Sequence, residues 1–200
     1  MNILWDFDGT LFDTYPAFTN IFYDILGGEI SKEEIYSHLK ISMTHAVRHF
    51  GFTEQQIRNW RNRETIHPGE TLPFSGVEKV LKFADLNVIM THKPRKEVLE
   101  ILEYYQWEPY FRHIVAGDDG FPRKPDPASY RFLHDEYGID LAIGDREIDI
   151  LPAKAIGIKT CLFQNQTPGA DLYLERYEDF FEMIADMKLA GERSPGGNRA

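Results

Sequence analysis

Short apolar runs recur along the chain, and each is followed by a segment with helical periodicity. The runs are NILWDF (residues 2–7), LNVIMT (86–91), HIVAG (113–117), LAIGD (141–145) and IKTCLF (158–163). They are enriched in Ile and Val and lack polar alternation, which is typical of strands buried on both faces of a parallel sheet. The alternation of strand and helix predicts an α/β fold, with a three-layer, doubly wound and mostly parallel sheet.

Residues 15 to 74 interrupt this alternation. They contain several helix signals, including capping boxes at residues 31–34 (SKEE) and 53–56 (TEQQ), and a third box at residues 75–78 (SGVE) opens the return to the main pattern. A segment of this length is too long for an ordinary connection between a strand and a helix. We therefore predict an α-helical cap domain over residues 15–74, inserted into a core made of residues 1–14 and 75–190. The polar, Gly- and Pro-rich residues 191–200 are expected to form a flexible tail.

Charge and composition narrow the classes of partner. The chain carries 22 basic and 32 acidic residues, a net charge of −10, which argues against a nucleic-acid polymer as partner. No run approaches the about 18 apolar residues of a membrane span, and no basic region that would indicate a secretory signal precedes Ile3. The single cysteine, Cys161, excludes an internal disulfide and fits a reducing compartment. These observations predict a cytoplasmic protein without a membrane partner, either a monomer or a homodimer.

Polar side chains gather where the predicted strands end. In an open α/β sheet, ligands bind outside the carboxyl ends of the strands. The residues at or just after those ends are Asp6, Asp8, Thr91, Lys124, Asp145 and Asp149. Crowded carboxylates repel one another unless a cation is present, and oxygen ligands suit a hard ion such as Mg²⁺. Together with a lysine and a hydroxyl, Mg²⁺ would make a receptor for a phosphoryl group.

Four segments carry a resemblance to a known family. The segments DFDGTLFDT, VIMTHK, RKPDP and IGDREIDI occur in this order, each at a predicted strand end. They resemble the motifs of the haloacid dehalogenase (HAD) superfamily of hydrolases, nearest to its phosphoglycolate phosphatase-like branch. The resemblance runs from residue 2 to about residue 163. The predicted helical insertion lies where that branch carries a small cap domain.

The resemblance implies catalytic roles for four residues. Asp6 would be the nucleophile that forms an aspartyl-phosphate, and Asp8 would protonate the leaving oxygen and later activate water. Thr91 would donate a hydrogen bond to a phosphoryl oxygen. Lys124 would neutralise both the phosphoryl group and the nucleophile.

The same resemblance implies a Mg²⁺ site. Its ligands would be Asp6, the backbone carbonyl of Asp8 and Asp145, and Asp149 would bind either directly or through water. Arg146 stands where small residues are frequent in the family. It would be either a surface arginine or a group that helps to fix the acidic residues.

The phosphate-binding residues are expected to be Gly9, Thr10, Thr91, His92 and Lys124. Gly9 and Thr10 would form a tight turn with exposed backbone N–H groups, which suit an anion. His92 departs from the family pattern, which most often has Asn at this position. Its imidazole would either change the phosphate and cap contacts or cap the following helix.

The predicted cap would select the substrate. The loop between its first two helices is expected within HLKISMTHAVRHFG, where Lys40, Ser42 and Arg48 are the candidates for substrate contact. For each of them a solvated helix face is the alternative. The hinges of a moving cap would lie near residues 14–16 and 72–76.

The leading hypothesis from the sequence is a Mg²⁺-dependent phosphatase acting on a small phosphorylated metabolite through an aspartyl-phosphate intermediate. One alternative is a phosphosugar mutase of the same fold, in which Asp8 returns the phosphoryl group to the substrate. Another is a non-catalytic phosphate-binding module. The sequence does not identify the substrate.

Overall fold

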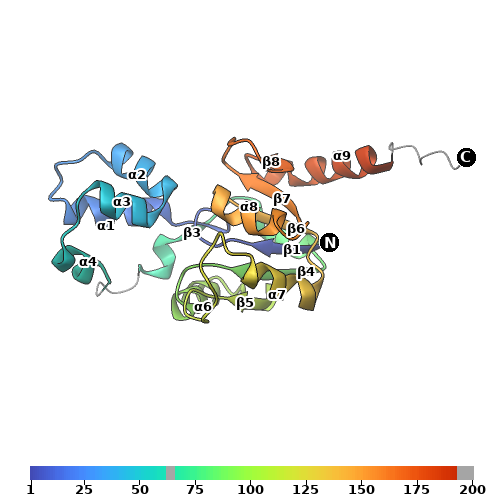
Figure 1. Cartoon of the computed structure of the whole chain (residues 1–200), viewed down its shortest axis with the longest axis horizontal. Coiled ribbons are helices and arrows are strands. Elements are labelled where there is room, and N and C mark those ends of the chain that lie inside the picture. The colour runs from blue at the N-terminus through green and yellow to red at the C-terminus, as the bar shows by residue number, and fades with distance from the viewer. Residues whose placement is uncertain (62–65, 193–200) are drawn as a thin grey trace, which may run out of the picture.

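The structure of the protein is a computed structural model, which describes residues 1–61 and 66–192. Its main body is a six-stranded sheet in the order β5-β4-β1-β6-β7-β8, in which each neighbouring pair is parallel (Figure 1). The strands are β1 (Asn2–Trp5), β4 (Leu86–Met90), β5 (Phe111–Val115), β6 (Leu141–Gly144), β7 (Lys159–Phe163) and β8 (Leu172–Leu174). The predicted α/β fold with a mostly parallel sheet is confirmed, and each of the five predicted runs overlaps a strand.

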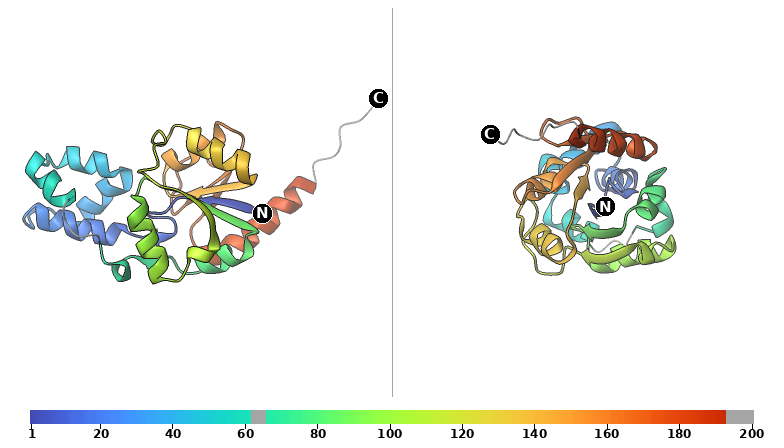
Figure 2. Two further views of the ribbon diagram at one scale, coloured as in Figure 1. Left: turned by 90° about the horizontal axis from the view of Figure 1, so that it is seen from below. Right: turned by 90° about the vertical axis from the view of Figure 1, so that its right-hand side faces the viewer.

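Helices cover both faces of this sheet, which gives three layers (Figure 2). They are α5 (Val77–Phe83), α6 (Arg95–Tyr104), α7 (Ala128–Tyr137), α8 (Glu147–Lys154) and α9 (Phe180–Glu192). Successive side chains of a strand point to opposite faces. Ile3 and Trp5 of β1 accordingly pack with α5, α6 and α9, whereas Leu4 packs with α7 and α8. All three side chains are buried, as expected for a central strand between two helical layers.

Helices α1 to α4 form the helical insertion, which has a small hydrophobic core of its own. Its helices are α1 (Tyr15–Ile25), α2 (Lys32–Ile41), α3 (Met43–His49) and α4 (Glu54–Arg61). Phe22, Ile35, Leu39 and Ala46 are buried among these helices. In Figure 1 the insertion lies to one side of the sheet, beyond the carboxyl end of β1. The insertion thus faces the edge where the polar residues were predicted to gather.

Of the three predicted capping boxes, the one at Thr53 forms in full, and the one at Ser31 shows its N-cap bond. The Ser31 hydroxyl accepts the Glu34 N–H at 3.1 Å, and the side chains of Thr53 and Gln56 accept each other's backbone N–H. The box predicted at Ser75 is wrong, because α5 begins after Gly76, whose φ of +80° is outside the range of an ordinary cap. The Ser75 hydroxyl instead donates to Glu178, 103 residues away. The Glu178 carboxylate thus takes the Ser75 hydroxyl, which a capping box would have bonded to the local backbone.

Two short strands join the insertion to the sheet domain. Strand β2 (Phe12–Asp13) pairs antiparallel with β3 (Leu72–Pro73), so that the chain leaves and returns side by side. This pair and β8 were not predicted, because two or three residues are too few to show a hydrophobic period. Helix α9 includes residues 191 and 192 of the predicted flexible tail, and the remaining residues of that tail lie outside the described part. Within residues 1–61 and 66–192, none of the helices has the length and apolar character needed to cross a bilayer.

Candidate active site

A tight turn after β1 places Asp6 and Asp8 at the carboxyl edge of the sheet. The Phe7 carbonyl accepts the N–H groups of Leu11 and Phe12, and that of Thr10 at 3.4 Å. Gly9 has a φ of +80°, and a Cβ there would lie 2.3 Å from the Tyr15 ring, so only glycine fits. The expectation of free N–H groups at Gly9 and Thr10 is wrong, since the Gly9 N–H donates to the Phe12 carbonyl at 2.8 Å. Both groups are used to close the turn.

Lys124 connects two carboxylates in the interior of the site. Its Nζ lies 2.6 Å from Asp6 Oδ1 and 2.8 Å from Asp149 Oδ1, and none of the three side chains is more than 3% exposed. Burial and then the Asp149 carboxylate raise the pKa of Asp6 to about 7, against the lowering effect of Lys124. Burial alone would lower the pKa of Lys124, but Asp149 and Asp6 hold it well above its usual value. Lys124 is therefore a permanent cation beside Asp6.

Asp145 is fully buried and joins the sheet domain to the helical insertion. Its Oδ2 accepts hydrogen bonds from the Tyr15 hydroxyl at 2.9 Å and from Lys40 Nζ at 2.8 Å. The Nε of Arg146 lies 3.6 Å from Asp145 Oδ1 and from Asp149 Oδ2. Of the two interpretations of Arg146, a group beside the acidic residues is the one that the geometry supports.

The acidic residues fit a hard cation. Asp6, Asp145 and Asp149 each offer an oxygen within 4.8 Å of the others. Two of their buried oxygens, Asp6 Oδ2 and Asp145 Oδ1, have no hydrogen-bond partner among the residues that the structure describes. A buried carboxylate oxygen without a partner is costly, and an oxygen-only donor set is the kind that Mg²⁺ prefers. The residues present therefore fit Mg²⁺.

The segment after β4 supports the Lys124 loop. The His92 Nε2 accepts the backbone N–H of Lys124 at 2.8 Å, and the buried Thr91 hydroxyl accepts the Lys93 N–H at 3.1 Å. Burial and the nearby Lys124 lower the pKa of His92 to about 3, which keeps the ring neutral. The predicted phosphate-binding residue His92 thus contacts the backbone of Lys124.

Asp8 lies nearer to solvent than Asp6 and has a different partner. Lys93 Nζ is 3.2 Å from Asp8 Oδ1 and 3.6 Å from Glu97 Oε2. No role was predicted for Lys93, although its position directly after Thr91 and His92 was a usable signal. Tyr15 was not predicted either, nor was Asn165, whose amide donates to the Asp145 carbonyl at 2.8 Å. Nothing local in the sequence marks these two residues.

The three residues predicted to select the substrate have separate positions. Lys40 reaches Asp145, as described above. Ser42 accepts the His45 N–H at 2.9 Å and so caps α3. Arg48 is exposed in the last turn of α3. Of the three, Lys40 is the one that the structure brings to the acidic residues.

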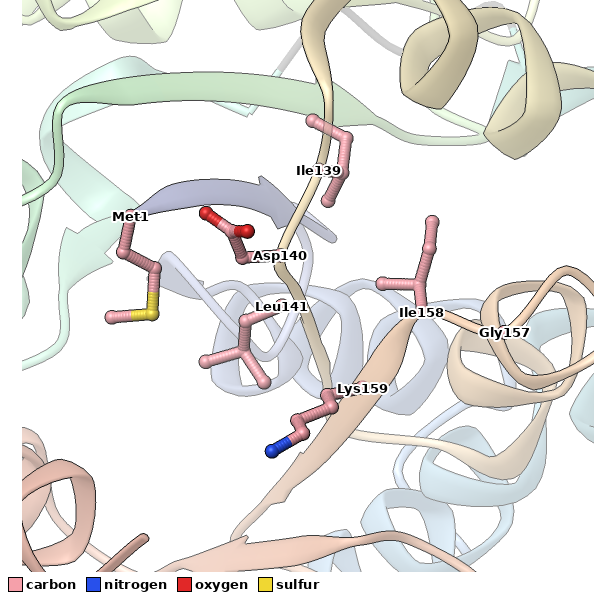
Figure 3. A pocket seen from close by; sticks show the side chains of 7 residues that line it. All are labelled: Met1, Ile139, Asp140, Leu141, Gly157, Ile158 and Lys159. Carbon is pink, nitrogen blue, oxygen red and sulfur yellow. The ribbon is translucent and has the colours of Figure 1, made fainter. Parts of the chain in front are cut away.

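A separate pocket lies at the opposite edge of the sheet. It has a volume of about 410 Å³, and Figure 3 shows the side chains that line it: Met1, Ile139, Asp140, Leu141, Gly157, Ile158 and Lys159. These residues precede or begin β1, β6 and β7. Because α/β sheets bind ligands at the carboxyl ends of their strands, the acidic residues, and not this pocket, are the candidate active site.

The parallel sheet, the helical insertion after the first strand and the buried carboxylates around a lysine define a class of α/β hydrolases. The chain belongs to the haloacid dehalogenase-like hydrolase family, whose sequence model matches residues 3–163. The resemblance seen in the four motifs is thereby confirmed. A hydrolase from Streptococcus pneumoniae has 31% identity and a TM-score of 0.62, covering 80% of this chain and 90% of its own.

Other relatives carry more specific names. Phosphoglycolate phosphatase 1 of Pseudomonas aeruginosa is 28% identical over 181 residues, covering 78% of this chain and 66% of its own. Pyrophosphatase PpaX of Bacillus pumilus is 29% identical, with 89% of each chain covered. A putative phosphoglycolate phosphatase from Lactobacillus plantarum has a TM-score of 0.78 at 18% identity, with 91% of this chain and 98% of its own covered, which shows the fold alone. The matches span between 36% and 66% of the length of the first curated relatives.

Proposed function

We propose that the protein is a Mg²⁺-dependent phosphatase that hydrolyses a small phosphorylated metabolite through an aspartyl-phosphate at Asp6. The observation that carries the proposal is the position of the Asp6 carboxylate. One of its oxygens is bound by the buried Lys124 at 2.6 Å, and the other is buried without a hydrogen-bond partner in the described chain. Membership of a hydrolase family supports the proposal.

The reaction follows from two aspartates in different surroundings. An Asp6 oxygen attacks phosphorus, the bond from phosphorus to the leaving oxygen breaks, and Asp8 gives that oxygen a proton. Asp8 then takes a proton from water, which attacks phosphorus and releases phosphate from Asp6. Lys124 offsets the charge of the nucleophile and the phosphoryl group throughout. Thr91, at the end of β4, would donate to a phosphoryl oxygen.

Mg²⁺ would be held by Asp6, Asp145 and Asp149, with the Asp8 backbone carbonyl. A bound Mg²⁺ would supply the positive charge that keeps these carboxylates ionised and reduces their repulsion of the phosphoryl group. The raised pKa of Asp6 supports this assignment, because Lys124 alone does not keep that carboxyl at its ordinary pKa. His92 positions the Lys124 loop by accepting its N–H.

The helical insertion would act as the cap over residues 15–74, with residues 1–14 and 75–190 as the catalytic core. Lys40, which reaches the site from α2, would meet the part of the substrate beyond the transferred phosphate. Relatives named phosphoglycolate phosphatase and pyrophosphatase suggest substrates with a second anionic group, which a lysine would suit. The cytoplasmic location and the choice between monomer and homodimer stay predictions.

Phosphate release from a panel of metabolites tests the proposal. The panel would include phosphoglycolate, pyrophosphate and hexose phosphates, with and without Mg²⁺. Asp6→Asn should reduce the activity at least about 1,000-fold, because no nucleophile is left. The matched control is Asp135→Asn, which changes an exposed aspartate. Activity of Asp6→Asn near the parent level would refute the mechanism, and an isomerised sugar phosphate without free phosphate would favour a mutase.

A further inference from the structure

Three histidines of the helical insertion lie against one another. His38 is near the end of α2, and His45 and His49 are on α3. Each offers a ring nitrogen within 4.8 Å of the others, and the rings of His38 and His49 stack with centroids 3.6 Å apart. We call these three residues the histidine cluster. It shares no residue with the acidic residues around Asp6.

The fold of the insertion brings these residues together. His45 and His49 are four residues apart and therefore lie on one face of α3. Ser42 ends α2 and caps α3 in an extended conformation, which folds α2 back along α3 and brings His38 over that face. The Phe50 ring meets His38 and His49 edge-on, with centroids 5.3 Å and 4.9 Å away, and supports the rings from one side.

The ring nitrogens are available as ligands. In the described chain the one hydrogen bond of these rings is between His38 Nδ1 and His45 Nε2, at 3.0 Å. Ligand nitrogens around a tetrahedral Zn²⁺ are about 3.3 Å apart, so this pair needs little movement to share an ion. Desolvation, then His49 and His45, lower the pKa of His38 against the opposing effect of Glu34. Neutral imidazole is the form that binds a metal.

We propose that the histidine cluster is a divalent transition-metal site that takes Zn²⁺ through three imidazole nitrogens, with a fourth position open to water. Three nitrogen ligands suit Zn²⁺ and similar ions, whereas Mg²⁺ prefers the oxygens of Asp6, Asp145 and Asp149. The two kinds of site are thus separated by donor chemistry. His38 and His45 are half-buried and His49 is exposed, so the ion can enter from solvent.

A metal at this position would fix the corner between α2 and α3. Lys40 lies on that corner, two residues after His38 and two before Ser42, and its ammonium reaches Asp145. An ion held by both helices would restrain the approach of Lys40 to the acidic residues. The role of the metal is therefore structural, and it takes no part in the chemistry at Asp6.

Calorimetric titration of the chelator-treated full chain with Zn²⁺ tests the site. Millimolar Mg²⁺ is present throughout, so that the carboxylates are occupied by the ion they prefer. We expect one Zn²⁺ per chain, a dissociation constant raised at least 30-fold in His45→Gln and in the exposed His49→Gln, and no change in the control His67→Gln. Co²⁺ should give the visible absorption of a tetrahedral nitrogen site in the parent and in Asp145→Asn, but not in His49→Gln.

Thermal unfolding gives a second readout. Zn²⁺ should raise the Tm of the parent and of His67→Gln, and leave the Tm of His49→Gln unchanged. The proposal is overturned if the parent binds no Zn²⁺, or if His45→Gln and His49→Gln bind it as tightly as the parent. Loss of the Co²⁺ spectrum in Asp145→Asn would also overturn it, by placing the ion at the carboxylates. None of these results depends on the phosphatase activity.

Discussion

Replacing Lys40 with methionine tests how the helical insertion controls the acidic residues. The change keeps an unbranched apolar stem and removes the ammonium that lies 2.8 Å from Asp145 Oδ2. Asp145 is fully buried, whereas the Lys40 side chain is 23% exposed. The substitution therefore leaves one carboxylate without a strong cationic partner while disturbing little packing.

The magnitude follows from this contact. At an effective dielectric constant of about 20, two unit charges 2.8 Å apart attract by about 6 kcal/mol. Desolvation of both groups offsets most of that attraction, so the expected loss of unfolding free energy is about 1–3 kcal/mol. Arg146, at 3.6 Å from Asp145, limits the loss further.

Two measurements on Lys40→Met check the reasoning. Urea unfolding in a chelator should show the full loss of stability, and saturating Mg²⁺ should reduce that loss, because the ion supplies the missing charge. By linkage, Mg²⁺ should bind Lys40→Met up to about ten-fold more tightly than it binds the parent, with each factor of ten worth about 1.4 kcal/mol. The matched control is Lys32→Met, which removes a lysine whose ammonium bonds to Asn20 at 2.7 Å. A Mg²⁺ dissociation constant in Lys40→Met that equals or exceeds that of the parent would refute the competition between Lys40 and the cation.

Three further predictions concern stability and reactivity. The folded chain holds the pKa of His92 at about 3 against an ordinary 6.5, so the unfolded chain binds a proton that the folded chain does not as the pH falls below 6.5. The unfolding free energy should therefore decrease between pH 6.5 and about pH 3, and urea titrations should show a weaker decrease for His92→Asn. Asn87→Leu leaves the Trp5 indole N–H and the Leu81 carbonyl without their bonds of 2.8 and 2.9 Å, and should cost about 2–4 kcal/mol in the same assay. The buried Cys161 thiol, whose pKa burial raises to about 12, should react with a disulfide reagent only as the chain unfolds; fast labelling of the native chain would contradict its position in the core.

The layout of the site was predictable because it depends on short sequence ranges. Asp6 follows β1 directly and Asp145 follows β6 directly, and parallel strands with the order of this fold bring such positions to one edge. The family motifs then identified Lys124 as a site residue, and the structure places its Nζ 2.6 Å from Asp6 Oδ1. Roles for these residues stay predictions, while their proximity is observed.

Other contacts were not predictable, for reasons that are equally physical. The Tyr15 hydroxyl and the Asn165 amide reach Asp145 across 130 and 20 residues, and neither contact leaves a local pattern. Ser75 matched a capping box, but Glu178 offered its hydroxyl a carboxylate and the backbone at Gly76 took another conformation. Local propensity is a weak guide where a charged partner arrives from elsewhere in the fold.

The pairing of β2 with β3 has a consequence for how such a chain can diversify. Asp13 and Leu72 are opposite each other in an antiparallel pair, so the ends of the whole insertion are one strand spacing apart. Because the ends of the insertion meet in this way, its length does not change the spacing of the strands to which it connects. The intervening residues can be lengthened, shortened or exchanged as one cassette while β1, β4 and β6 keep their register. Under the proposed function, this junction of two residues on each side separates the part of the chain that would carry the chemistry from the part that would select the substrate.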